Sequence, residues 1–280
     1  MKRVAIQGVE GCYHEMAAKE YFENENIETV ECLSFQEMFK NFGKDRNLFG
    51  VMAIENTIAG PLLQNHELLR NSDMKIIGEY KLHISHTLAA LPGETIEDIK
   101  EVNSHPIALM QCMEFLDKYN KIKIVEKGDT ASSAKEISTR NLKGHAAICS
   151  EYAANLYNMN ILYKEIETNK RNFTRFLVLA DKWIADDMID LKSVNKASVE
   201  FCVTHVEGSL SKVLTTLYFY EMNLTKIQSL PIIGREWEYR FYLDLTFNDY
   251  SKYKKAIEAV IPFTKDFNII GEYKEFEMKE

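Results

Sequence analysis

The sequence predicts an α/β protein followed by a smaller α+β unit. Apolar segments alternate with helical stretches from residue 1 to about residue 181, and a different order of segments follows from about residue 196. Such alternation is typical of parallel sheets that are covered by helices. The length of 280 residues also corresponds to about two domains.

Five pairs of strand and helix are expected in the first region, each an apolar run followed by a segment with helical periodicity. The pairs cover residues 3–8 and 11–24, 49–56 and 60–71, 101–105 and 106–119, 123–129 and 130–141, and 145–150 and 151–159. The apolar run 176–179 predicts a further strand that is buried on both faces. Arg175 precedes this run, and a charge at the edge of a core needs a partner. It therefore either pairs with a carboxylate or binds an anion.

Small or hydroxyl-bearing residues lie between these strands and helices. Their first expected role is N-capping, because their side chains satisfy free backbone N–H groups. Helix N-termini also bind anions, and ligands of α/β sheets collect at the carboxyl ends of the strands. The turns therefore predict a cleft for a small anion; they contain Gly8 and Gly11, Asn56 and Thr57, Ser104, Asp129 and Thr130, and Ser150.

The second region begins after an acidic segment, residues 182–195, which is predicted to be a linker. The expected strands and helices follow in the order βαββαβ, which is that of a ferredoxin-like unit. Gly234 lies between the two middle strands, as a hairpin requires. Edge strands in so small a sheet commonly pair with a partner subunit.

Composition excludes several classes of function. The formal net charge is −8 and there is no basic run, so no nucleic-acid partner is expected. No apolar run approaches the roughly 20 residues of a membrane helix, and the N-terminal residues do not predict a signal peptide. Five scattered cysteines predict neither disulfides nor a zinc site, which favours a cytoplasmic location. Surface or core roles are expected for the histidines, because no spacing for a metal connects His14, His66, His83, His86, His145 and His205.

Five separated motifs occur in the order found in a known family. They are GVEGCYHEMAA at residues 8–18, GVMAIENTIAG at 50–60, VNSHPIALMQC at 102–112, DTASSA at 129–134 and RNFTRF at 171–176. Together with the βαββαβ unit, they resemble a prephenate dehydratase with a C-terminal ACT regulatory domain. The resemblance implies a two-lobed, periplasmic-binding-protein-like catalytic domain at residues 1–181, the linker at 182–195 and the ACT domain at 196–280.

The family reaction converts prephenate, a dianion, to phenylpyruvate with loss of CO2 and water, and it uses no metal or other cofactor. By resemblance, Thr174 donates a hydrogen bond to the departing hydroxyl group, which is a weak form of general-acid assistance. Arg175 either binds a substrate carboxylate or pairs with Glu55. Substrate contacts are expected from Asn56, Thr57, Ser104, His105, Thr130, Asn172 and Phe176. Three positions depart from the family pattern: Ala53 replaces proline, Ile107 replaces glutamine, and Cys12, expected as a buried thiol, replaces threonine or serine.

The resemblance also implies that the ACT domain senses phenylalanine at the interface of a homodimer or homotetramer. The expected contacts are Gly208, Ser209 and Leu210 in a glycine-led loop, and Asn223, Leu224, Gln228 and Ser229 on a facing strand. The family segment ESRP is QSLP at residues 228–231, so phenylalanine affinity is expected to differ. Arogenate stays open as the substrate. A non-catalytic solute-binding protein and a purely regulatory ACT partner are the rival interpretations.

Overall fold

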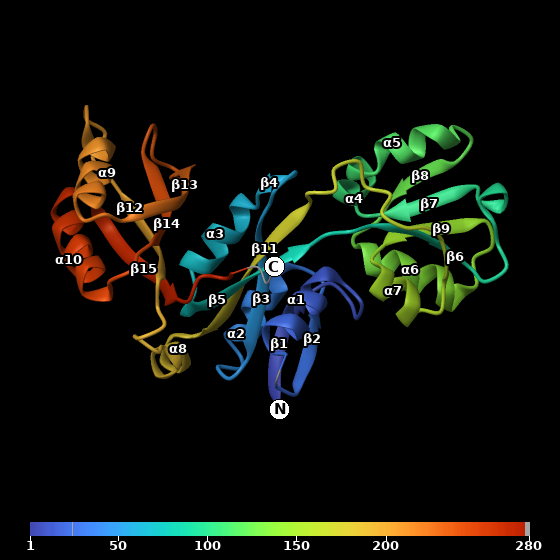
Figure 1. Cartoon of the computed structure of the whole chain (residues 1–280), viewed down its shortest axis with the longest axis horizontal. Helices are drawn as coiled ribbons and strands as arrows, with labels where there is room; N and C mark the ends of the chain where they lie inside the picture. The colour runs from blue at the N-terminus through green and yellow to red at the C-terminus, as the bar shows by residue number, and fades with distance from the viewer. Residues whose placement is uncertain (24, 278–280) are drawn as a thin grey trace. The chain divides into compact units, whose positions relative to one another are not determined.

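The computed structural model describes residues 1–23 and 25–277 (Figure 1). The chain folds into two compact units. The first unit comprises Met1–Leu68 and Tyr80–Leu177, and the second comprises Leu69–Glu79 and Val178–Glu280. Asn24, at the end of the first expected helix, lies outside the described residues. Two strands, β5 (Met74–His83) and β11 (Phe173–Asp181), belong to both units.

One sheet of the first unit has the strand order β11-β3-β1-β2. The pairs β1–β2 and β1–β3 are parallel, which agrees with the predicted parallel sheet for β1 and β3, and the short β4 is antiparallel to β3. Its elements besides β11 are β1 (Lys2–Gln7), α1 (Tyr13–Tyr21), β2 (Ile27–Cys32), α2 (Phe35–Phe42), β3 (Phe49–Asn56), β4 (Gly60–Pro61) and α3 (Leu63–Arg70). The sequence pattern did not predict β2 or α2.

The other sheet of the first unit has the order β10-β6-β9-β7-β8. It is mixed rather than parallel, because β6 is antiparallel to both β9 and β10. Figure 1 shows α4 and α5 on one face and α6 and α7 on the other. The elements are β6 (Thr87–Ala90), η1 (Ile96–Asp98), β7 (Glu101–Ser104), α4 (Pro106–Gln111), α5 (Met113–Leu116), η2 (Asp117–Tyr119), β8 (Lys123–Glu126), α6 (Thr130–Arg140), β9 (His145–Cys149), α7 (Glu151–Leu156) and β10 (Asn160–Tyr163).

The capping roles are confirmed at two of the predicted turns. Asp129 accepts a hydrogen bond from Ser132 N, and Ser150 accepts one from Ala153 N. Cys12 precedes α1 without a side-chain cap, and it is a buried thiol as expected. Glu15 satisfies the nearby Gly11 N–H instead, at 2.5 Å.

The second unit contains the predicted βαββαβ order in a sheet arranged β13-β14-β12-β15-β5. Helices α9 and α10 pack together on one face of its antiparallel strands (Figure 1), and Gly234 has a φ of 79° in the turn before β14. The segment predicted as a linker contains a helix, α8. The elements besides β5 and β11 are α8 (Lys182–Met188), β12 (Lys196–Cys202), α9 (Ser209–Phe219), β13 (Asn223–Pro231), β14 (Tyr239–Thr246), α10 (Tyr250–Val260), η3 (Ile261–Phe263) and β15 (Lys265–Tyr273).

A buried ion pair fixes β5 to the rest of the second unit. Lys196 Nζ lies 2.9 Å from Glu79 Oε1, and both side chains are buried. Glu275 approaches the same ammonium at 3.3 Å. Each charge therefore has a partner, which a buried charge requires.

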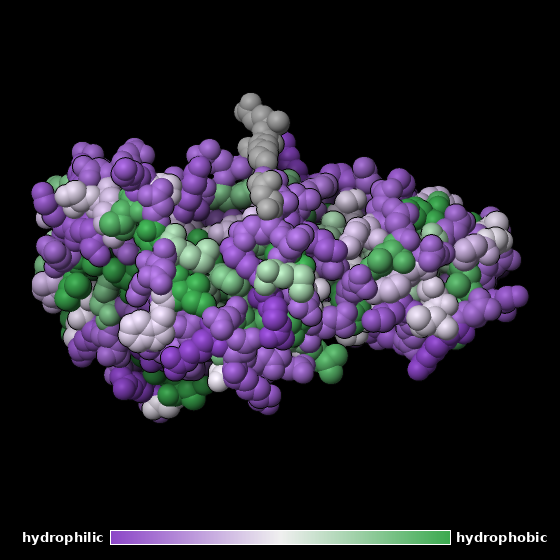
Figure 2. Space-filling view, turned by 90° about the horizontal axis from the view of Figure 1, so that it is seen from below, coloured by the Kyte–Doolittle hydropathy of each residue, from purple (hydrophilic) through white to green (hydrophobic). Residues whose placement is uncertain are grey.

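The molecular face in Figure 2 is mainly hydrophilic, with hydrophobic residues interspersed. Across residues 1–23 and 25–277, no helix is both long and apolar enough to span a bilayer.

Candidate active site

The first unit contains a pocket of about 390 Å³, a size suited to a small-molecule ligand. Residues from all five sequence motifs line it. Its polar and aromatic lining includes Gln7, Tyr13, His14, Phe35, Asn56, His86, His105, Gln111, Asp129, Thr130, Thr174 and Phe176. Small and aliphatic residues, Ala53, Ile84, Ile107 and Ala108 among them, form much of the remaining wall.

The start of β11 carries Thr174 and is held from both sides. The Thr57 hydroxyl accepts a hydrogen bond from Phe173 N at 2.9 Å and donates to the Arg171 carbonyl at 3.1 Å. On the other side, Ile84 N donates to the Asn172 carbonyl at 2.7 Å. Behind Thr174, residues 176–180 are at most 3% exposed, so the strand is fixed by packing.

Asn56 sets the direction of the hydrogen bonds around Thr174. Its Oδ1 accepts from two backbone donors, Ile58 N at 2.9 Å and Ala59 N at 2.8 Å. Because a backbone N–H can only donate, this atom must be the amide oxygen. The Asn56 amide group then points Nδ2 toward Thr174 Oγ1 at 3.0 Å and Asn172 Oδ1 at 2.8 Å.

The direction of donation set by Asn56 continues through the side-chain amides of Asn172 and Gln111. Asn172 accepts from Asn56, so its Nδ2 donates to Gln111 Oε1 at 2.9 Å. Gln111 Oε1 also accepts from His86 Nε2 at 2.9 Å, while Gln111 Nε2 lies 3.4 Å from Asn56 Oδ1. Asn172, Gln111 and His86 are all buried, so this network is satisfied without bulk water.

The direction of the network determines what Thr174 can do. Its oxygen accepts from Asn56, and no described residue accepts its hydroxyl hydrogen. A hydroxyl group has one donor and can accept at the same time. The Thr174 O–H is therefore free to donate to a ligand in the pocket.

Arg175 points elsewhere. Its guanidinium lies 3.1 Å from Glu55 Oε1, the side chain is 7% exposed, and Arg175 is not a pocket-lining residue. Of the two alternatives for Arg175, a substrate carboxylate or Glu55, the structure shows the pair with Glu55. The ion pair joins β11 to β3, next to Asn56 and Thr174.

The other predicted substrate contacts fall into two groups. His105, Thr130 and Phe176 line the pocket, as Asn56 does. Ser104 does not line it: its fully buried hydroxyl donates to the Ile148 carbonyl at 2.6 Å. Thr57 and Asn172 support the start of β11 and are also absent from the lining. In place of Ser104, His105 caps α4 by accepting from Ile107 N at 3.2 Å.

The electrostatics of the pocket are unusual for an anion site. Among the described lining residues there is no lysine and no arginine, and Asp129 is the only carboxylate. Burial raises the pKa of Asp129, although backbone N–H groups at the start of α6 oppose this shift. Burial lowers the pKa of His14 to about 3 and also lowers those of His86 and His105.

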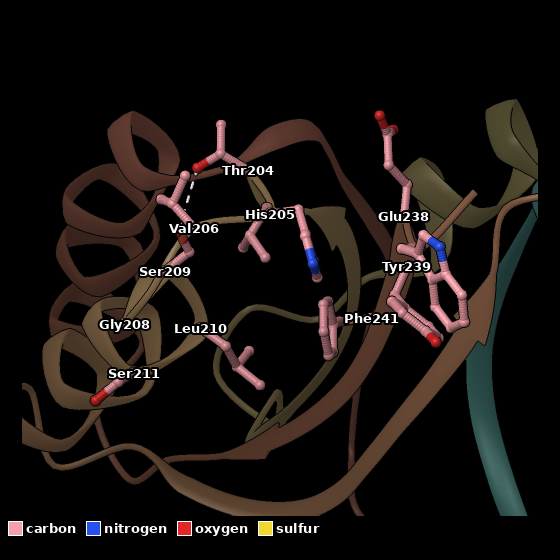
Figure 3. Close-up of a pocket in the computed structure, with 12 residues that line it drawn as sticks. Thr204, His205, Val206, Gly208, Ser209, Leu210, Ser211, Glu238, Tyr239 and Phe241 are labelled. Carbon is pink, nitrogen blue, oxygen red and sulfur yellow. Dashed lines mark hydrogen bonds between the residues drawn. The ribbon is translucent and has the colours of Figure 1, made fainter. Parts of the chain in front are cut away.

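The second unit has a separate pocket of about 340 Å³ (Figure 3). Gly208, Ser209 and Leu210 line it, as do residues 203–206 and 237–239 and Phe241. His205, Leu210 and Phe241 point toward the same space, and Thr204 bonds to Ser209 at 3.1 Å (Figure 3). The predicted contacts on β13, Asn223, Leu224, Gln228 and Ser229, are not part of this lining.

A comparison with protein families matches residues 4–183 to the prephenate dehydratase family. The chain belongs to the prephenate dehydratase family. A curated relative, arogenate dehydratase/prephenate dehydratase 2 of Arabidopsis thaliana, is 34% identical over 97% of this chain and 72% of its own. These matches confirm the family predicted from the five motifs, and with it the prediction of a lyase of phenylalanine biosynthesis.

Two solved structures share the fold. A prephenate dehydratase of Arthrobacter aurescens in complex with L-Phe has a TM-score of 0.85 and 22% identity, over 97% of this chain and 89% of that one. A quorum-quenching acylase, GqqA, has a TM-score of 0.84 and 24% identity, over 98% of both chains. Identities this low extend the likeness to the fold of the whole chain and no further.

Sequence reasoning missed several residues of this dehydratase-family pocket, among them Tyr13, His14, His86 and Gln111. Tyr13, His14 and Gln111 lie within two of the quoted motifs, which was the available signal. His86 lies outside the motifs, and the absence of metal spacing said nothing about a hydrogen-bonding role.

The Arg175–Glu55 pair predicts coupling in stability. Arg175→Gln, Glu55→Gln and the double variant should show an interaction free energy of about 1 kcal/mol in urea unfolding, because Glu55 is partly exposed. The exposed pair Lys164–Glu151, 57% and 50% exposed, is the control and should give less than about 0.5 kcal/mol. An Arg175→Gln variant with a much higher KM, beside an unaffected Glu55→Gln variant, would instead assign Arg175 to the substrate.

Proposed function

We propose that this chain converts prephenate to phenylpyruvate and that Thr174 donates a hydrogen bond to the hydroxyl group that leaves. The observation that carries the proposal is the direction of the amide network, which uses the Thr174 oxygen as an acceptor and leaves its hydrogen for a ligand. A donor fixed before the reaction stabilises developing negative charge without reorganisation.

The proposed reaction consumes a proton. The C–C bond to the ring carboxylate breaks, its electron pair enters the ring, and the C–O bond to the hydroxyl group breaks. The dianion and one proton give the phenylpyruvate monoanion, CO2 and water. Because threonine is a weak acid, its role is a hydrogen bond to the departing oxygen, and the proton comes ultimately from solvent.

The walls of the pocket favour loss of CO2. Phe176, Ile84 and Phe35 present apolar surface, and a carboxylate against such surface is poorly solvated. His105 and Thr130 remain proposed substrate contacts. The His105 Nδ1 is used by Ile107 N, so its Nε2–H is the group that faces a ligand. Arg175 is proposed to act indirectly, by stiffening the wall through Glu55.

Arogenate is the second candidate substrate, and Asp129 is the observation that favours it. Arogenate carries an ammonium group where prephenate has a keto group, and an ionised Asp129 would attract that ammonium. The name of the Arabidopsis relative includes both activities. Purified protein should therefore be assayed with each substrate, following phenylpyruvate and phenylalanine separately.

Thr174→Val is expected to lower kcat about 10²- to 10³-fold, because it removes one donor to the transition state and keeps the shape. Thr174→Ser should retain most of the activity. Phenylpyruvate formation from prephenate measures both variants. Thr139→Val changes an exposed threonine on α6 and is the matched control. A Thr174→Val variant with the wild-type kcat would remove Thr174 from the mechanism.

We further propose that the second unit is an ACT domain that binds phenylalanine in a homodimer or homotetramer. Its βαββαβ order and the pocket beside Gly208 support this. Strand β13 lies at the end of the strand order, and Ile227 on it is 48% exposed, so this edge is suited to pairing with a second copy. Through such pairing, Gln228 and Ser229 would contribute to the pocket of the partner.

L-phenylalanine is expected to inhibit phenylpyruvate formation, and Gly208→Val should weaken that inhibition about tenfold or more. Gly208 has a φ of 74°, a conformation that a β-branched residue adopts only with strain. Gly93→Val is the control, because Gly93 has a φ of 89° and lies in the first unit. Unchanged activity of the wild-type enzyme in millimolar phenylalanine would contradict this proposal.

A further inference from the structure

We propose that His86 takes up a proton when the dianionic substrate enters the pocket, and that it thereby supplies the positive charge which the lining otherwise lacks. The inference rests on the proposed function. It identifies a residue that tunes substrate binding through charge rather than through a direct contact with the reacting atoms.

The starting observation is an imbalance of charge. A substrate with two carboxylates must enter a pocket that has no lysine or arginine among its described lining residues and that contains the carboxylate of Asp129. Anion sites usually provide cations or several free N–H groups. Three histidines line the pocket, His14, His86 and His105, and they are the groups there that can become cationic.

Two of these histidines cannot gain a proton without losing a hydrogen bond. His105 Nδ1 accepts from Ile107 N at 3.2 Å, and His14 Nε2 accepts from Ala53 N at 3.4 Å. Protonation would place two hydrogens face to face in each case, since a backbone N–H cannot reverse. His14 and His105 are therefore expected to stay neutral.

His86 is different because both of its ring nitrogens face groups that can accept. Its Nε2 lies 2.9 Å from Gln111 Oε1, an oxygen whose identity follows from the backbone donors at Asn56. Its Nδ1 lies 3.0 Å from the Tyr13 hydroxyl, which also lies 2.7 Å from the Ser85 carbonyl.

The Tyr13 hydroxyl can serve both charge states of His86. When His86 is neutral, Nε2 carries the hydrogen and Tyr13 donates to Nδ1. When His86 is charged, Tyr13 rotates its hydrogen to the Ser85 carbonyl and accepts from Nδ1–H. Both ring nitrogens of His86 keep a hydrogen bond in the two states, and the Ser85 carbonyl accepts the Tyr13 hydrogen only in the charged state. Protonation therefore requires only the rotation of one hydroxyl hydrogen.

The surroundings of His86 act on its pKa in both directions. Burial lowers its pKa, while the bond to Gln111 and the negative charge of Glu167 oppose that shift. Glu167 is buried, accepts from His86 N at 2.8 Å, and has the Lys170 ammonium 3.7 Å from its other oxygen. Burial raises the pKa of the Cys112 and Cys149 thiols to about 12 and raises the pKa of Tyr13 well above its ordinary value, so these groups remain neutral. Two added carboxylates then favour the charged form of His86.

The sign of the expected pH dependence follows from this scheme. The pKa of His86 is below its ordinary value in the free enzyme and is raised in the complex. Between these two pKa values, binding takes up a proton, so affinity falls as the pH rises. The wild-type KM should increase by about tenfold per pH unit in that window, and the KM of His86→Gln should be independent of pH there. A purely structural role of His86 would change KM by the same factor at every pH.

Calorimetry tests the proton directly. Prephenate is titrated into the slow Thr174→Val enzyme near neutral pH in two buffers of different ionisation enthalpy, and any proton used in phenylpyruvate formation is subtracted. The Thr174→Val enzyme is expected to take up about one proton per site. The double variant that also carries His86→Gln is expected to take up almost none. Tyr13→Phe removes the acceptor for His86 Nδ1–H and should also suppress proton uptake. It replaces His86→Gln in this test if that variant does not fold. His145→Gln, outside the pocket, is the control and should leave uptake unchanged.

The outcomes separate this inference from the proposed function. Wild-type enzyme that forms no phenylpyruvate from prephenate overturns both. If the enzyme forms phenylpyruvate but prephenate binding takes up no proton, only the role of His86 is overturned. The same holds if the His86→Gln and Tyr13→Phe variants take up as many protons as the parent Thr174→Val enzyme. Uptake lost in both variants and kept in His145→Gln supports it.

Discussion

The geometry of the pocket depends on one constraint: Asn56 Oδ1 accepts hydrogen bonds from Ile58 N and Ala59 N. Backbone donors cannot change direction, so they orient the Asn56 amide and, through it, Asn172, Gln111 and the ring of His86. Such a network is satisfied in one direction only, and burial makes any reversal expensive. Thr174 stands at one end of it as an acceptor, which leaves its own hydrogen for the substrate.

The same constraint explains how a pocket without lysine or arginine can serve an anionic substrate. The polar groups are amides, hydroxyls and histidines held in fixed orientations, and preorganised dipoles stabilise charge well where water is excluded. Arg175, the most conspicuous cation near the site in the sequence, pairs with Glu55. In the proposed mechanism, Arg175 stiffens the contact between β3 and β11, and the one charge that changes lies at His86.

Much of this arrangement could be predicted from the sequence, and the reasons differ between elements. The run at residues 176–179 reads as a buried strand because both faces of β11 are packed. Strand β2 was missed because its residues, IETVEC, do not alternate regularly between apolar and polar side chains and are mostly exposed or partly exposed. Ser104 was assigned to the substrate because it precedes a helix and lies within a family motif, yet its hydroxyl donates to the Ile148 carbonyl and His105 caps the helix. His86 was missed because its role depends on partners far away in sequence, Tyr13 and Gln111, which only the fold brings together.

The central claim concerns the positions of hydrogens, and neutron diffraction from crystals exchanged into D2O observes them directly. We expect deuterium on Asn56 Nδ2 directed at Thr174 Oγ1, and the Thr174 deuterium directed into the pocket. A Thr174 deuterium directed at the Asn56 side chain would contradict the account, because Thr174 would then have no hydrogen to offer the departing hydroxyl group.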